Sequence, residues 1–108
     1  MFKLNTQRTY KFPVAVNIFD GDKEQTGKFT AVFKVMKNSA IQEAAAAGDK
    51  NLLDMVLMDV EGIQVDGEDG KPLAGEALLS ALKDDPSVAI ALAAAYNESL
   101  VKKNRPRT

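Results

Sequence analysis

Apolar and polar residues alternate along the first third of the chain, with the period of two that is typical of a β-strand. Residues 28–36 repeat the alternation after a polar segment, residues 20–27, that we expect to be a loop. Because Pro13 has no backbone N–H to donate, we expect the first strand at the edge of a sheet or Pro13 at its start. Two such strands predict an antiparallel hairpin, which needs further elements to cover its apolar face. The apolar positions of the first strand are Tyr10, Phe12, Val14, Val16 and Ile18.

The middle of the chain changes to apolar spacings of three and four residues, which predict helices. A short helix is expected to begin at Ser39, which stands three residues before Gln42 as in a capping box, and to end at Gly48. Asp49 then caps a second helix that runs to Gly62. The apolar stripe of this second helix consists of Leu52, Leu53, Val56, Leu57 and Val60.

Two more helices are predicted in the last third of the chain. A Leu-rich helix contains Leu78 and Leu82, and a final helix is capped by Asp85 with Pro86 at its first position. An Ala-rich flank on the final helix allows a neighbouring element to approach closely. The apolar stripe of that helix consists of Val88, Leu92, Tyr96 and Leu100.

The expected fold class is therefore α+β, with an N-terminal antiparallel β-hairpin followed by a small bundle of about four helices. The length of 108 residues is typical of one domain, so we assign residues 1–108 to a single domain. Residues 1–8 and 102–108 are expected to be flexible ends.

Composition restricts the chemistry that is available to this domain. The chain has no Cys, which excludes disulfides, thiolate nucleophiles and Cys-type zinc sites. It also has no His, which removes the usual general base near neutral pH and the commonest metal ligand. We therefore expect a protein that is not an enzyme and that uses no cofactor or metal.

The acidic segment VDGEDGKPLAGE, residues 65–76, resembles part of a calcium-binding loop. With Gly70 at loop position 6, Asp69 and Glu76 occupy the ligand positions 5 and 12. Positions 1 and 3 are then Val65 and Gly67, which have no side-chain oxygen. The segment is also a poor match to a catalytic carboxylate pair or a phosphate-binding loop, so we interpret it as a turn that leads into a helix.

Charge and hydropathy indicate a protein of the cytoplasm. The net charge is −1, and no apolar run approaches the roughly 20 residues that span a bilayer. The basic tail, residues 102–107, is a candidate for contact with nucleic-acid phosphates, but it has no aromatic residue for base stacking. We therefore expect no membrane partner, and we keep a small nucleic-acid-binding regulator only as a third possibility.

The order of motifs in the second half of the chain resembles the tail assembly chaperones of long-tailed bacteriophages. These motifs are Val60-Glu61-Gly62, Asp69-Gly70-Lys71-Pro72-Leu73, the Leu-rich helix, Asp85-Pro86, Tyr96 and Lys103-Asn104. The N-terminal hairpin agrees in kind, so that the resemblance covers roughly residues 10–104. One departure is Val60, because the family usually has Trp at this position.

The resemblance implies a cytoplasmic protein of a phage- or prophage-carrying bacterial host cell that takes part in virion assembly without catalysis. Members of the family bind the tape measure protein, a very long helical chain with much apolar surface, and keep it soluble until tail tube subunits replace them. The major tail protein is a further candidate partner, and a homo-oligomer is a further candidate state. The main alternative is a structural tail protein of the tube or terminator type.

Candidate contacts with the client protein lie on the last two helices and the basic tail. Helix-in-groove recognition uses apolar anchors at helical spacing, and these helices supply them. For Tyr96 we expect a core or interface position with the hydroxyl at the rim. The candidate residues are Leu78, Leu82, Leu92, Tyr96, Leu100, Lys102 and Lys103.

Overall fold

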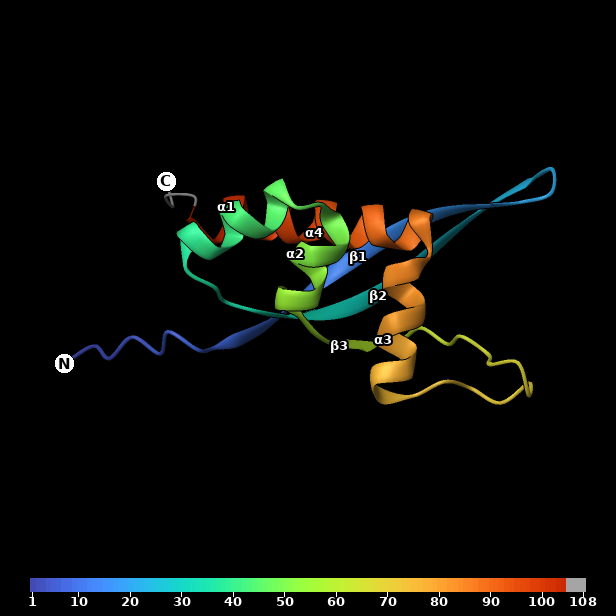
Figure 1. Ribbon diagram of the computed structural model, residues 1–108, viewed down its shortest axis with the longest axis horizontal. Coiled ribbons are helices and arrows are strands. Elements are labelled where there is room, and N and C mark those ends of the chain that lie inside the picture. Colours follow the sequence, from blue (N-terminus) through green and yellow to red (C-terminus); the bar gives the residue numbers. More distant parts are fainter. Residues whose placement is uncertain (105–108) are drawn as a thin grey trace.

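The computed structural model describes residues 1–104, apart from the side chains of Asp49 and of residues 102–104 (Figure 1). The predicted α+β class is confirmed, with the N-terminal antiparallel hairpin and four later helices, and a third strand is added between the second and third helices. The elements are β1 (Thr9–Asp20), β2 (Lys23–Lys34), α1 (Asn38–Ala46), α2 (Asp49–Val56), β3 (Leu57–Glu61), α3 (Gly75–Asp84) and α4 (Pro86–Asn104).

The hairpin is longer than the sequence pattern indicated. Pairing between β1 and β2 runs without interruption from Thr9 opposite Lys34 to Asp20 opposite Lys23. The predicted loop of residues 20–27 is therefore wrong, because the turn consists only of the two residues between Asp20 and Lys23. Gly21 makes this tight turn feasible, since its φ of 64° lies in the region that favours glycine.

The three strands form one antiparallel sheet in the order β1-β2-β3. Pro13 therefore lies in an edge strand, as its missing N–H predicted. Alternate residues of β1 and β2 face the helices and build the core. The buried side chains of these two strands are Val14, Val16, Phe29, Ala31 and Phe33.

β3 replaces the second half of a predicted helix. The expected helix to Gly62 is wrong, because α2 ends at Val56 and the chain then pairs with β2. Leu57 pairs with Phe33 and Asp59 with Val32, so that Met58 is an extra residue in a β-bulge. The bulge reverses the alternation, and therefore Leu57 and Val60 both reach the core although they are three residues apart.

α4 covers the apolar face of the sheet. It packs against β1, α2 and α3, and the helices lie on one face of the sheet (Figure 1). Val88, Leu92 and Tyr96 are buried at this contact, as the predicted stripe required. The Ala-rich flank is also largely buried, which confirms that small side chains let neighbouring elements approach α4. None of the helices within residues 1–104 is both long and apolar enough to cross a membrane.

The helix caps differ in how well the sequence predicted them. α1 begins at Asn38 with Lys37 as its N-cap and without a side-chain cap, so the predicted capping box at Ser39 is wrong. Its first two residues, Asn38 and Ser39, are exposed, so that water can satisfy their N–H groups. At α4 the prediction is confirmed, since Asp85 Oδ1 accepts hydrogen bonds from the backbone N–H groups of Ser87 (3.0 Å) and Val88 (3.2 Å).

This cap generates a stability prediction. Asp85→Ala removes the acceptor of two backbone N–H groups at the start of α4, and we expect it to lower the free energy of unfolding by about 1 kcal/mol. Asp84→Ala is the matched control, because the neighbouring Asp84 makes an exposed ion pair with Lys50 and, within the described residues, accepts no hydrogen bond from a helix N-terminus. Chemical denaturation of both variants measures the difference, and equal losses would contradict the capping role of Asp85.

Candidate partner-binding site

An apolar cleft lies where the hairpin extends beyond the helices. The molecule measures 51 × 29 × 28 Å, and the far end of the hairpin projects along the longest axis (Figure 1). The cleft has a volume of about 390 Å³ and is open on one side. Its lining comes from β1, β2, the segment after β3, α3 and α4, namely Val16, Ile18, Gly27, Lys28, Phe29, Gly62, Ile63, Gln64, Val65, Ala81, Leu82, Asp85 and Val88.

The hairpin projects because its strands are longer than the helix that covers them. The 12 residues of β1 span about 40 Å at the rise of an extended strand. The 19 residues of α4 span only about 28 Å at the rise of an α-helix. The inner face of the hairpin beyond Val16 is therefore left without a covering helix, and Ile18 becomes part of an open wall.

The opposite wall is formed by the chain as it leaves the sheet. Gly62 has a φ of 82°, which turns the chain out of β3 directly after Glu61. The next residues keep an apolar alternation, so that Ile63 and Val65 are half-buried against the core while Gln64 is exposed. Their apolar side chains face Ile18 and Phe29 across the cleft.

The few polar groups of the cleft do not form a catalytic arrangement. They are Lys28, Gln64 and Asp85. The carboxylate of Asp85 already accepts two backbone hydrogen bonds as the cap of α4. The side chains of Lys28 and Gln64 are exposed, as in the polar rim that surrounds the apolar centre of many binding sites. The arrangement can bind an apolar side chain, and it offers no pair of groups poised for proton transfer.

The acidic segment forms a small turn, as predicted. Asp66 and Pro72 form an isolated bridge, and the N–H of Gly67 donates to the carbonyl of Lys71 at 2.8 Å. Asp69 Oδ1 accepts a hydrogen bond from the backbone N–H of Lys71 at 3.1 Å, which ties this carboxylate to the turn. Within the described part of the chain, no cluster of acidic residues is arranged to hold a metal ion.

The predicted contact residues fall into three groups. Leu82, Leu92 and Tyr96 are buried in the core, and of these only Leu82 also lines the cleft. Leu78 and Leu100 are half-buried at the edge of the core. Lys102 and Lys103 belong to α4 by their backbone, but their side chains, like residues 105–108, lie outside the described residues. Among the five of these residues whose side chains the structure describes, three are buried in the core and two are half-buried, so these five do not form one accessible surface.

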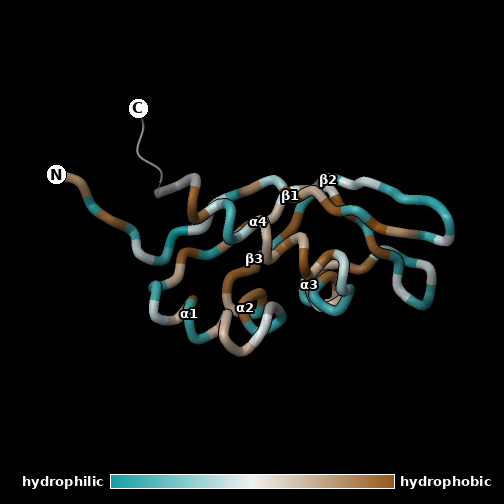
Figure 2. The backbone as a smooth tube through the Cα atoms, turned by 90° about the horizontal axis from the view of Figure 1, so that it is seen from above, coloured by the Kyte–Doolittle hydropathy of each residue, from teal (hydrophilic) through white to brown (hydrophobic). Residues whose placement is uncertain are grey.

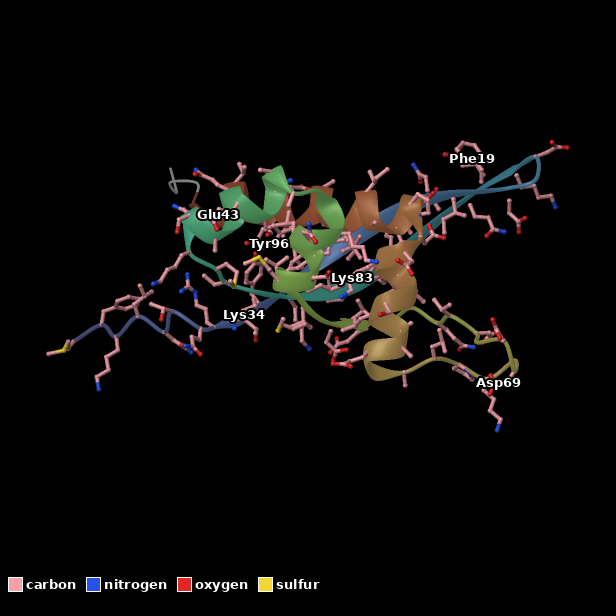
Figure 3. The ribbon with its side chains drawn as sticks, in the orientation of Figure 1. Phe19, Lys34, Glu43, Asp69, Lys83 and Tyr96 are labelled. Carbon is pink, nitrogen blue, oxygen red and sulfur yellow. The ribbon has the colours of Figure 1, made fainter. Side chains whose placement is uncertain are left out.

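Tyr96 lies at the centre of the core, between α4 and the sheet (Figure 3). Its ring meets the ring of Phe33 edge to face at 5.2 Å. The expected position of its hydroxyl at the rim is wrong, since the side chain is 0% exposed and its oxygen has no hydrogen-bond partner among the described residues. Burial raises the pKa of Tyr96 to about 12, and the nearby Tyr10 contributes to the shift.

Ser99 links α4 to the first strand beside this ring. Its Oγ donates to the carbonyl oxygen of Tyr96 at 2.6 Å and lies 2.8 Å from the hydroxyl of Tyr10. Ser99 is fully buried, so that these bonds satisfy a polar group that would otherwise be costly in the core. Its role is thus structural, and sequence periodicity alone did not indicate it.

The sequence interpretation placed the site on the helices and missed both walls of the cleft. Ile18 and Phe29 were assigned to the apolar face of a hairpin, which is correct, but the openness of the cleft that they line depends on where α4 begins. Val65 was interpreted as the start of a turn, and Ile63 was assigned to no element. The signal that was present is the alternation of apolar residues at 63 and 65 immediately after a strand.

Comparisons with known proteins add no family to these observations. No family model, no curated protein and no solved structure matches the chain. Arguments about function therefore depend on the cleft itself and on the motif order described above.

The unpaired hydroxyl of Tyr96 generates a second stability prediction. Tyr96→Phe removes a buried polar group without a partner, so we expect the free energy of unfolding to stay unchanged or to rise by up to about 1 kcal/mol. Tyr10→Phe is the control, because its hydroxyl bonds to Ser99 and its loss should lower stability. Denaturant unfolding measures both, and a clear loss of stability in Tyr96→Phe would show that its hydroxyl has a partner.

The raised pKa of Tyr96 also predicts the pH dependence of stability. In the unfolded chain Tyr96 ionises near pH 10, whereas in the folded protein it ionises only near pH 12. Ionisation of Tyr96 therefore leaves stability unchanged below about pH 10, and it lowers stability as the pH rises from about 10 to about 12, because the unfolded chain loses the proton first. Thermal unfolding between pH 9 and 12 should show a smaller loss in Tyr96→Phe than in the wild type.

Proposed function

We propose that this protein is a tail assembly chaperone of a long-tailed phage or prophage, which binds the tape measure protein without catalysis. The observation that carries the proposal is the apolar cleft beneath the projecting hairpin. The motif order in the sequence supports the identity of the client. The cleft supplies what such a client requires, namely an apolar site that stays accessible in the folded chaperone.

In this proposal, apolar side chains on one face of a client helix enter the cleft. Ile18 and Phe29 receive them from the hairpin side, and Ile63 and Val65 from the opposite side. The exposed side chains of Lys28 and Gln64 meet the polar flank of the helix. This is helix-in-groove recognition, in which spaced apolar anchors provide affinity and the polar rim limits orientation.

The size of the cleft suits a temporary complex. Full burial of one Leu-like side chain stabilises by about 1.5–3 kcal/mol, and a cleft of this size holds few of them. Association itself costs several kcal/mol, so that a single cleft binds weakly. Several copies along one long client would mask it together, while each copy remains easy to displace.

The family position that usually holds Trp has a structural role in this chain. Val60 is buried in β3 and pairs with Ala31 of β2. A contact between a partner and an indole at this position is therefore not part of the proposal. The cleft walls begin two residues later, at Gly62.

Substitution of one hairpin residue tests the proposal. Ile18→Asp places an unpaired charge in the apolar cleft, and we expect at least a ten-fold loss in binding of the tape measure protein. Phe19→Asp is the matched control, because Phe19 neighbours Ile18 but is 74% exposed and does not line the cleft (Figure 3). Co-expression of each variant with the tape measure gene of the same genome, followed by co-purification, measures the effect.

The outcomes separate the alternatives. A soluble client that co-purifies with wild type and Phe19→Asp but not with Ile18→Asp supports the cleft as the client site. The proposal is contradicted if the client stays insoluble in the presence of the wild type, or if only Phe19→Asp fails to co-purify with the client. Circular dichroism checks that both variants are folded.

A structural tail protein remains the main alternative, since the open edge of β1 is suited to stable assembly. A chaperone should be present in infected or induced cells and absent from the finished particle. Mass spectrometry of purified virions measures this, and abundance comparable to that of the tube subunit would contradict the chaperone proposal.

A further inference from the structure

A second unpartnered apolar feature lies at the opposite end of the molecule from the cleft. Residues 1–5, which we call the arm, precede β1 and lie in an extended chain without helix or strand (Figure 1). Phe2 is 87% exposed and Leu4 is 61% exposed. In an extended segment these two side chains, two residues apart, lie on the same side. The arm thus presents two apolar side chains to solvent.

The two ends of the molecule differ in charge. No acidic residue occurs before Asp20, and Lys3 and Arg8 lie in or beside the arm. Residues of the segment before β1 share a small surface pocket with Lys34 and Lys37, which adds to the basic end. Figure 3 shows Lys34 near this end of the molecule and Asp69 at the other.

The cleft end carries the opposite charge. Asp20, Asp22 and Glu24 form the tip of the projecting hairpin, with Lys23 as the basic residue among them. The turn on the other side of the cleft contributes a second acidic group. It consists of Asp66, Glu68 and Asp69, with Lys71 beside them.

The cleft end also has an open strand edge. β3 pairs with β2 only from Thr30 to Phe33, so the edge of β2 from Lys23 to Phe29 is unpaired on the side of β3. Gly27, Lys28 and Phe29 of this edge line the cleft. An extended segment added along the edge would therefore direct every second side chain into the cleft.

We infer that the arm of a second copy of this chain binds along the open edge of β2 and places Phe2 and Leu4 in the cleft. The arm has the extended form and the apolar spacing that pairing with this edge requires, and its basic charge is opposite to that of the acidic tip and turn on either side of the cleft. The arm of one chain does not reach its own cleft, because the arm begins at the end of β1 opposite the hairpin turn and extends away from that turn (Figure 2). The backbone N–H of Val35 donates to the carbonyl of Arg8 at 3.0 Å and holds the base of the arm there.

The contact joins two different surfaces, so it is heterologous. Each bound copy still offers its own free cleft or arm, and association can continue into rings or linear chains. A strand of five residues forms a small interface, which predicts weak and concentration-dependent association. Since the cleft is also the proposed client site, the arm would compete with a client; this competition rests on the proposed function, whereas the self-association does not.

Sedimentation of the 108-residue chain alone tests the inference over a concentration series from micromolar to millimolar. We expect the average mass of the wild type to rise with concentration and to fall when salt is added, because the ends attract each other electrostatically. The Phe2→Ser/Leu4→Ser double variant should remain monomeric throughout. Ile90→Ser is the control, since Ile90 is 63% exposed on α4 and should leave association unchanged.

A mixing experiment distinguishes this contact from a symmetric dimer. The arm double variant has an intact cleft but no apolar arm, and Ile18→Asp has an intact arm but an altered cleft, so each variant alone should be monomeric. In an equal mixture, the arm of Ile18→Asp should bind the cleft of the arm double variant. The mixture should therefore form a complex of two chains and nothing larger. If Ile18→Asp unfolds by circular dichroism, Val65→Asp on the opposite wall takes its place. A wild type that is monomeric at every concentration, an arm variant that associates like the wild type, or a mixture without complex would overturn the inference. None of these results requires the client, so each is separate from a failure of the proposed function.

Discussion

The contact between α4 and the apolar face of the sheet is the interaction on which the structure depends. A hairpin of this length exposes a continuous row of apolar side chains, and it is stable only when another element buries them. α4 does so with Leu92 and Tyr96, and the edge-to-face contact of Tyr96 with Phe33 lies at the centre. The bond between Ser99 and Tyr10 then joins residues that are 89 positions apart in the chain.

The same contact determines where the binding cleft forms. The junction at Asp85 and Pro86 sets the first residue of α4. It therefore also sets the point along β1 beyond which α4 no longer covers the strand. Ile18 lies beyond that point and Val16 lies under it. The core and the binding cleft are thus two parts of one apolar face of the hairpin. The position of the N-cap of α4 sets the boundary between them.

The sequence predicted the fold class, the N-terminal hairpin though not its full length, the edge position of Pro13, the cap at Asp85 and the acidic turn. Each of these follows from local chemistry, namely alternation, a missing N–H group or a carboxylate before a helix. β3 was missed because its bulge gives Leu57 and Val60 the three-residue spacing of a helix, and only pairing with β2 distinguishes the two. The cleft was missed for a related reason, since its openness depends on the relative lengths of β1 and α4, which no local pattern contains.

The order of the elements along the chain has a consequence for synthesis. The helix that seals the sheet is made long after the strands that it covers, and the ribosome adds about 5–20 residues per second. During that interval the apolar face of the hairpin is exposed on the nascent chain. Each round of translation therefore passes through an intermediate with exposed apolar surface. Folding is completed only after the segment containing Tyr96 has left the exit tunnel of the ribosome.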